Sequence, residues 1–283
     1  MSYVFSRDLL TDPFLPDSDP ILGGVLKTEP GFLDMPRVMH VHDDRLEILF
    51  LSEGEATHII GNHTCKVKAG DLITYNAGVP HEEFIGATAD LSAYAIIITG
   101  LRMKNLPPNT LFGEDQHPII RTGPQMALIH SLVDQMYGKL ASGRPSSIFY
   151  ANSMAVTLLC YILDSLDGSP DKIREIETTN GLRIKAYLDS HFKDTVTLQA
   201  LSRELYLNPS YISHVFKNYS GYSPMQYVTR RRIGEAQSLL IHTDLQLSEI
   251  ALSVGYANSS MFSRAFKQLV GITPHQYRTE WQR

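Results

Sequence analysis

The sequence has few of the features expected of a secreted or membrane-spanning protein. It contains two cysteines, Cys65 and Cys160, so it offers no disulfide framework and no zinc-cluster spacing, and a reducing compartment is expected. The first residues lack a basic segment followed by an apolar stretch, which argues against a secretory signal. The longest apolar stretch, residues 148–166, is interrupted by polar residues such as Asp164, which predicts a buried or interface helix. These absences favour a cytoplasmic protein.

Length and charge distribution indicate two parts of different character. A chain of 283 residues and 31.7 kDa is too long for one ordinary domain and about right for two. Residues 180–283 contain 12 Lys and Arg against 7 Asp and Glu, whereas residues 1–179 contain 13 against 23. A basic part joined to an acidic part suggests that one half meets a polyanion, although chance also produces such a difference.

The basic part contains an internal repeat. Residues 206–227 align with residues 256–277 at a constant offset of 50, with ten identities in 22 positions and no gap. Each copy predicts a helix, a tight turn and a second helix, with N-caps at Asn208 and Asn258 and C-caps at Gly221 and Gly271. This pattern is typical of the helix-turn-helix, whose second helix enters the major groove of DNA. Two ordinary helical hairpins would not explain why the caps, serines and lysine recur.

The exposed face of each second helix carries donors and cations that suit contact with DNA. The candidates are Ser210, Ser213, His214 and Lys217 in the first copy, and Ser259, Ser260, Ser263, Arg264 and Lys267 in the second. A connecting helix over residues 225–242 would span roughly 27 Å, near the length of one DNA turn, about 34 Å. We therefore expect the two second helices in successive major grooves. The arginines at 230–232 would contact phosphate or form a solvated face.

These motifs resemble a known family. Residues 247–278 include Gly255-Tyr256, Arg264, Phe266-Lys267 and Gly271, and residues 181–283 as a whole resemble the DNA-binding domain of AraC/XylS transcription regulators. The resemblance implies an all-α domain with helix-turn-helix motifs at about residues 198–221 and 248–271. It places the candidates above where recognition helices meet double-stranded promoter DNA. It also implies a homodimer, with RNA polymerase as a partner if the protein is an activator.

The acidic part has the pattern of a β-structure. Short β-type runs at residues 47–52, 56–60, 71–75 and 93–99 are separated by turn signals that end in Gly54, Gly70 and Gly78 or include Gly61. That spacing predicts an all-β sandwich or jelly roll.

Two segments of this part carry metal-binding residue types. His40, His42 and Glu47 lie in the first and His81 ends the second, and the segments resemble the two cupin motifs, whose ligand residues they match. Histidines two residues apart on a strand share one face, and three imidazoles with a carboxylate suit zinc, iron, manganese, nickel or copper. Three hypotheses stay open: a divalent transition metal, an organic effector held by the same residues, and purely structural histidines.

Further effector contacts are predicted near the mouth of this domain. Glu83 lies close to His81, and Tyr94 lies on a later strand with an alternating pattern. A mixed polar and aromatic lining would suit a sugar or another hydroxylated small molecule.

The middle of the chain predicts a helical hairpin. Apolar residues recur at spacings of 3 and 4 over residues 126–140, a narrow stripe like a coiled-coil seam, and a more apolar helix follows over residues 147–166. Each stripe is either core or interface. A narrow stripe beside a fully apolar helix permits both, with the second helix packed on the β-domain and the first paired with another subunit.

Together these patterns predict an α+β two-domain chain. It has an arm at residues 1–20, a cupin-like effector-binding β-barrel (jelly roll) at 21–120, a dimerising helical hairpin at 121–167, a linker at 168–180 and the all-α double helix-turn-helix domain at 181–283. We predict a ligand-responsive transcription regulator, an activator of a carbohydrate-utilisation operon, and no enzyme. The alternatives are a metal sensor or metal-dependent cupin enzyme fused to a DNA-binding domain, and an effector-free regulator.

Overall fold

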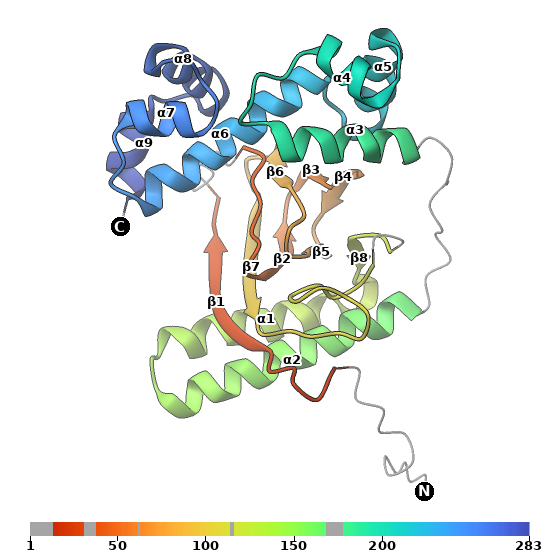
Figure 1. The fold of residues 1–283 in the computed structure, drawn as a ribbon. Helices are drawn as coiled ribbons and strands as arrows, with labels where there is room; N and C mark the ends of the chain where they lie inside the picture. The colour runs from red at the N-terminus through yellow and green to blue at the C-terminus, as the bar shows by residue number, and fades with distance from the viewer. Residues whose placement is uncertain (1–13, 31–37, 62, 114–115, 168–177, 283) are drawn as a thin grey trace, which may run out of the picture.

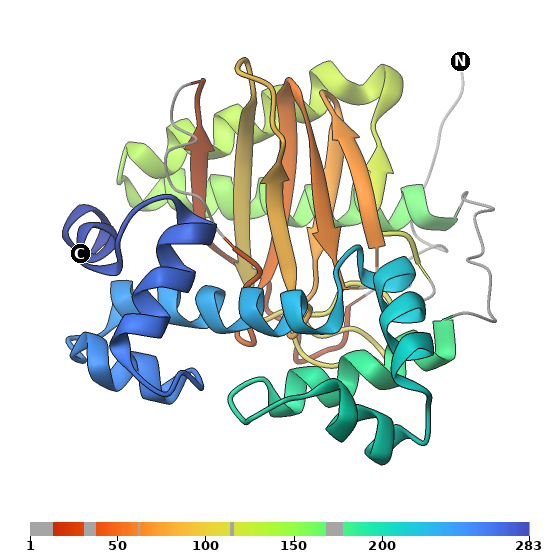
Figure 2. The same ribbon diagram turned by 90° about the horizontal axis from the view of Figure 1, so that it is seen from above.

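The computed structural model describes residues 14–30, 38–61, 63–113, 116–167 and 178–282. Two β-sheets occupy the centre of the molecule, with a helical pair on one side and the helices of the C-terminal part on the other (Figures 1 and 2). Most of the predicted arm, residues 1–13, and most of the predicted linker, residues 168–177, lie outside the described residues.

The two sheets form the β-barrel, and all of their strand pairs are antiparallel. The strands are β1 (Ile21–Thr28), β2 (Leu46–Glu53), β3 (Glu55–Ile60), β4 (His63–Lys68), β5 (Asp71–Tyr75), β6 (His81–Ile85), β7 (Ser92–Thr99) and β8 (Ile119–Arg121). One sheet has the order β1-β7-β2-β5-β8 and the other β4-β3-β6. The glycines predicted at turns adopt positive φ angles at Gly54, Gly61, Gly70 and Gly78, so the predicted turns are confirmed.

Alternation along the strands divides the apolar side chains between two cores. Leu49, Ile73 and Tyr75 belong to the core between the sheets. Ile48 and Ile96 belong to a second core, which the larger sheet shares with the helical pair.

The helical pair consists of α1 (Met126–Ala141), preceded by the short 3₁₀ helix η1 (Gly123–Gln125), and α2 (Pro145–Asp167). The two predicted helices are confirmed. The stripe on α1 is buried, because Ile129, Val133 and Met136 are at most 1% exposed and pack against the larger sheet and α2. The hypothesis that this stripe pairs with another subunit is therefore wrong: the sheet covers it, as sequence periodicity alone does not specify.

Helix α2 is unusually apolar. Among the described residues it is the one helix whose length and composition would suffice to cross a membrane, and 33% of its most apolar window is buried. Ala151, Leu158 and Ile162 pack into the core with the sheet, as expected for a helix of a folded domain. Near its start, Phe149 and its neighbours are exposed.

The C-terminal part is entirely helical over its described residues. Its helices are α3 (Thr178–His191), α4 (Leu198–Leu205), α5 (Pro209–Ser220), α6 (Pro224–His242), α7 (Leu247–Ser253), α8 (Ser259–Val270) and α9 (Pro274–Trp281). The predicted caps are confirmed: Asn208 accepts a hydrogen bond from the Ser210 amide, Asn258 accepts one from the Met261 amide, and Gly221 and Gly271 close their helices in the left-handed conformation. Helices α4–α5 and α7–α8 form two helix-turn-helix units joined by α6.

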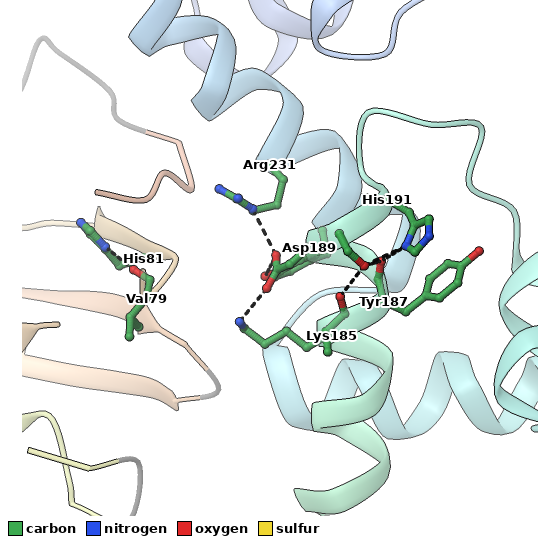
Figure 3. A network of polar contacts seen from close by, with 10 residues as sticks. Val79, His81, Lys185, Tyr187, Asp189, His191 and Arg231 are labelled. Carbon is green, nitrogen blue, oxygen red and sulfur yellow. Dashed lines mark hydrogen bonds and ion pairs between the residues drawn. The ribbon is translucent and has the colours of Figure 1, made fainter. Parts of the chain in front are cut away.

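A partly buried polar network joins α3 to α6 (Figure 3). The Asp189 carboxylate on α3 accepts hydrogen bonds from Lys185 (2.7 Å), from Arg231 (3.2 Å) and from the Tyr227 hydroxyl (2.8 Å). The Arg231 side chain is 7% exposed, so Asp189 supplies the charge that makes its burial tolerable.

Candidate functional site

The second helices of the two units, α5 and α8, present their predicted faces to solvent. On α5, Ser210, His214 and Lys217 are exposed and Ser213 is half-buried; on α8, Ser260, Arg264 and Lys267 are exposed, and Ser259 and Ser263 are half-buried. The two helix-turn-helix units lie along one side of the β-barrel (Figure 1), and the C-terminal end of α5 borders the barrel, where Tyr219 and His63 line one cavity. The opposite faces are core, with Phe216 and Phe266 fully buried. The barrel therefore leaves both candidate recognition faces uncovered.

The three consecutive arginines of α6 contact protein groups, so the hypothesis of a phosphate-binding or solvated face does not hold in this structure. Arg230 pairs with Glu82 of the β-barrel, Arg231 binds Asp189, and Arg232 donates to the carbonyl oxygens of Phe192 and Asp194. A sequence pattern identifies such cations but not the carboxylates and carbonyls that folding brings to them.

Three of the four predicted metal-ligand residues come together in what we call the histidine cluster: His40, His42 and His81. One ring nitrogen from each lies within 4.8 Å of the others. His40 bridges to His81 through paired backbone hydrogen bonds of 2.9 Å, yet it lies outside the named strands. The prediction that His40 and His42 share a strand is thus wrong in detail. An extended segment beside β6 brings the rings together.

Backbone carbonyls fix the tautomer of two of these rings, that is, which ring nitrogen carries the proton. His40 Nδ1 lies 3.2 Å from the Val38 carbonyl oxygen, and His81 Nδ1 lies 2.9 Å from the Val79 carbonyl oxygen. Because a carbonyl oxygen only accepts, each Nδ1 carries the proton and donates it. Each neutral ring therefore keeps the lone pair of Nε2, which is the form that binds a metal.

Acidic and aromatic groups surround the cluster. Glu47 is the fourth predicted ligand, and its Oε2 lies 3.6 Å from His42 Nε2. Tyr75 stacks on His81 with ring centroids 4.2 Å apart, and its hydroxyl lies 2.6 Å from Nδ1 of the buried His58. Burial, with the nearby His81 as a second cause, lowers the pKa of His58 to about 3, so His58 is neutral at physiological pH. This histidine, which sequence analysis did not single out, extends the polar lining into the barrel.

The two weaker effector candidates have different positions. Glu83 reaches the interior of the barrel. The pKa of Tyr75 is raised there, mainly because Tyr75 is buried and next because of the charge and hydrogen bond of Glu83. Tyr94 instead belongs to the core beneath α1, and its hydroxyl donates to Asp134 of α1 at 2.8 Å. The structure therefore does not bring Tyr94 to the histidine cluster, because its position on β7 faces the opposite side of the sheet.

The histidine cluster opens on a cleft between the β-barrel and the C-terminal helices. This histidine cleft has a volume of about 60 Å³ and is lined by His40 and His42 on one wall and by Gly234, Gln237 and His242 of α6 on the other, among further residues. A larger cavity of about 130 Å³ lies between the barrel and helices α3 and α5, and its lining includes Lys185, Tyr219 and His63. Neither the cleft nor the α6 residues in it were predicted, since they depend on contacts between distant parts of the chain.

Comparison with known proteins identifies both halves. A family model described as a helix-turn-helix domain matches residues 201–280, and one described as a cupin domain matches residues 24–97. The chain is 25% identical to the HTH-type transcriptional regulator YdiP of Escherichia coli (strain K12), over 86% of this chain and 81% of that protein. It is 28% identical to the raffinose operon transcriptional regulatory protein RafR of Pediococcus pentosaceus (83% and 85%), and 23% identical to the lactose operon transcription activator of Staphylococcus xylosus (81% and 81%).

The domain matches agree with the architecture. The helix-turn-helix match begins within α4 and ends within α9. The cupin match runs from within β1 to within β7 and includes the histidine cluster. The full-length relatives are transcription regulators. The chain is therefore a DNA-binding transcription regulator that joins a cupin domain to a double helix-turn-helix domain, and it is similar over most of its length to known transcription regulators.

Proposed function

We propose that this regulator responds to a small molecule bound at the barrel mouth and activates a carbohydrate-utilisation operon. The histidine cleft carries the proposal, because one ligand there would touch the cupin domain and α6 of the DNA-binding domain together. A ligand changes a conformational equilibrium only through different affinities for the two arrangements. Relatives that serve raffinose and lactose operons support a sugar as effector, and the neighbouring polar and aromatic groups suit hydroxyls.

A panel of sugars tests this proposal. The full-length protein is titrated with each sugar while its melting temperature and its affinity for promoter DNA are measured. The proposal expects at least one sugar to stabilise the protein and to change DNA affinity. A panel that changes neither quantity would contradict a sugar effector and leave the DNA-binding role untouched.

For DNA recognition, we propose the residues predicted on α5 and α8. Their exposure, complete or partial, on helices whose opposite faces are buried supports this role. Lys217 and Lys267 would bind phosphate and Arg264 would contact a base edge. A regulator that activates transcription at a promoter would also contact RNA polymerase, and it would act in the cytoplasm as a protein without catalytic activity.

A homodimer is the next part of the proposal, with α2 in place of the buried α1 stripe as the contact. Ile148, Phe149 and Tyr150 are consecutive and exposed, Phe149 by 77%, on a helix of which only part is buried. Two copies of this surface would bury one another, and a dimer would present four recognition helices to two half-sites.

Replacing Phe149 with serine should weaken this dimer. Losing a buried phenylalanine side chain costs about 1.5–3 kcal/mol. A symmetric dimer loses two of them, about 3–6 kcal/mol, which raises the dimer Kd at least roughly 100-fold. Light scattering after size-exclusion chromatography over a concentration series measures the shift. Leu252→Ser on α7, also an exposed apolar residue, is the control and should leave the dimer intact. Equal behaviour of the two variants would remove α2 from the interface.

A metal ion in the histidine cluster is the second candidate function of the cupin domain. The protonated Nδ1 of His40 and of His81 leaves their Nε2 atoms as ligands, and Glu47 lies next to His42. This donor set fits a divalent transition metal, with His40, His42, His81 and Glu47 as the residues that would hold it. Such an ion would supply a fixed positive charge at the mouth of the barrel.

Elemental mass spectrometry of protein purified without chelator tests the metal site. We expect one equivalent of a transition metal for each chain. His42→Ala should lower the affinity by more than the roughly 10- to 100-fold that loss of an outer hydrogen-bond partner costs, since it removes a ligand. His214→Ala on α5 is the control and should retain the metal. A metal-free wild type, or a His42→Ala variant that keeps its metal, would contradict the assignment.

A further inference from the structure

The segment from Val38 to His42 faces two domains at once. His40 and His42 belong to the histidine cluster of the cupin domain. Val38 and Met39 are 3% and 0% exposed, and they pack in one continuous core with Ile184, Ile233 and other residues of the DNA-binding domain. Five residues thus carry two candidate metal ligands and a main apolar contact between the domains.

A chain of hydrogen bonds links the cluster to α6. His40 donates from Nδ1 to the Val38 carbonyl oxygen at 3.2 Å, and the Val38 amide donates to Oε1 of Gln237 at 3.0 Å. Gln237 lies on α6 and is 4% exposed. The orientation of the His40 ring and the position of α6 are therefore both set through the backbone of Val38.

A glycine in the middle of α6 permits this close approach. A Cβ atom at Gly234 would overlap the carbonyl oxygen of Met39. Glycine inside a helix costs about 1 kcal/mol relative to alanine, and no turn or positive φ explains it here, since Gly234 lies within regular helix. The contact with Met39 explains why this position lacks a side chain.

A second contact joins α6 to the strand that carries His81. Glu82, the next residue on β6, is 5% exposed and accepts hydrogen bonds from Arg230 and from the Tyr222 hydroxyl (3.1 Å). The Arg230 guanidinium also lies 4.2 Å from the centroid of the Tyr222 ring. Both segments that supply the histidine cluster are consequently attached to the DNA-binding domain.

We propose that metal binding at the histidine cluster and docking of α6 on the cupin domain are coupled, so that the docked arrangement binds the metal more tightly. This inference rests on the proposed metal site. Zinc holds imidazole nitrogens at about 2.0–2.1 Å, so the three rings must converge on one point. Docking holds the Val38–His42 segment and β6 in place before the ion arrives, which reduces the ordering that binding requires. By linkage, the bound metal favours docking by the same factor.

The coupling makes the cupin domain a metal-dependent anchor for the DNA-binding domain. The recognition faces of α5 and α8 stay exposed in the docked arrangement, so docking does not block DNA. It fixes where the two helix-turn-helix units of each chain sit relative to the barrel. In a dimer, that position sets the distance between the half-sites the protein can span.

Zinc affinity of a variant altered outside the ligand set tests the coupling. Full-length wild type, Gly234→Ala and Gly138→Ala are titrated with Zn²⁺ in competition with a chromophoric chelator. Gly138 lies in α1, where an added Cβ would meet nothing within 4 Å, so its variant is the matched control. We expect Gly234→Ala to bind zinc at least about 5-fold more weakly, the lower end of typical coupling, and Gly138→Ala to match wild type.

Hydrogen exchange of the Val38–His42 amides reports whether α6 is docked on the cupin domain. Gln237→Ala is a second variant, in case Gly234→Ala does not fold: it removes the acceptor of the Val38 amide without adding volume. Undocked variants that bind zinc as tightly as wild type would overturn the coupling. Wild type that binds no zinc would overturn the metal site, and with it the coupling. Binding of promoter DNA, measured on the same samples, tests the regulator function separately.

Discussion

Replacing Asp189 with asparagine is expected to lower the free energy of unfolding of the DNA-binding domain by about 1–3 kcal/mol, the typical cost of leaving a buried polar group without its partner. The change leaves Arg231, whose side chain is 7% exposed, without its counter-charge. It also weakens the hydrogen bonds from Lys185 and Tyr227 that tie α3 to α6. The single tryptophan, Trp281, lies at the end of α9 in the same domain, so its fluorescence in a urea titration follows the unfolding.

Glu235→Gln provides the matched control. Glu235 on α6 pairs with Lys193 at 2.9 Å, but the two side chains are 29% and 51% exposed. Such a pair contributes about 0–1 kcal/mol, since solvent screens it. If the two variants lost equal stability, the contacts of Asp189 in Figure 3 would not be what stabilises the buried Arg231 side chain.

Arg264→Ala is expected to weaken binding to specific DNA by about 1–3 kcal/mol and to relax the preference at one base-pair position, because arginine reads guanine through two hydrogen bonds. Fluorescence anisotropy with selected and scrambled duplexes at one salt concentration measures both effects. The salt concentration is held constant because contacts with phosphate make the affinity for DNA depend on it.

The control for this variant lies one turn further along the same helix. Gln268 is exposed on α8, and Gln268→Ala should leave affinity and base preference close to wild type. An Arg264→Ala variant with wild-type affinity and unchanged preference would exclude Arg264 from base recognition.

Local chemistry was sufficient to predict much of this fold. Asn208 and Asn258 cap their helices because a side-chain oxygen one residue before the helix meets a free amide, a requirement that neighbouring residues decide. The turns at Gly54 and Gly78 follow in the same way, since positive φ favours glycine. The repeat then placed two such units in one domain, and the cupin-like motifs marked the histidines that the structure brings together.

The features that sequence analysis missed depend on which surfaces meet. The stripe of Ile129 and Val133 has the spacing of an interface as much as that of a core, and the sheet that covers it lies far away in the sequence. Arg230 has the composition of a phosphate contact, yet Glu82 lies 148 residues away and pairs with it. In the sequence, Gly234 only lowers the helix propensity of residues 225–242. The structure shows that the Met39 backbone occupies the space that a side chain at this position would need. Periodicity defines a face of an element but not its partner.

Selection of DNA from a random library by the full-length protein tests whether α5 and α8 both read DNA sequence. We expect each half-site of the enriched DNA to contain two blocks whose centres lie about 10–10.5 base pairs apart, one for each recognition helix. We also expect that Arg264→Ala degrades one block and leaves the other. Enrichment of no sequence, or of a single block that Arg264→Ala leaves unchanged, would contradict a regulator that reads DNA through both α5 and α8.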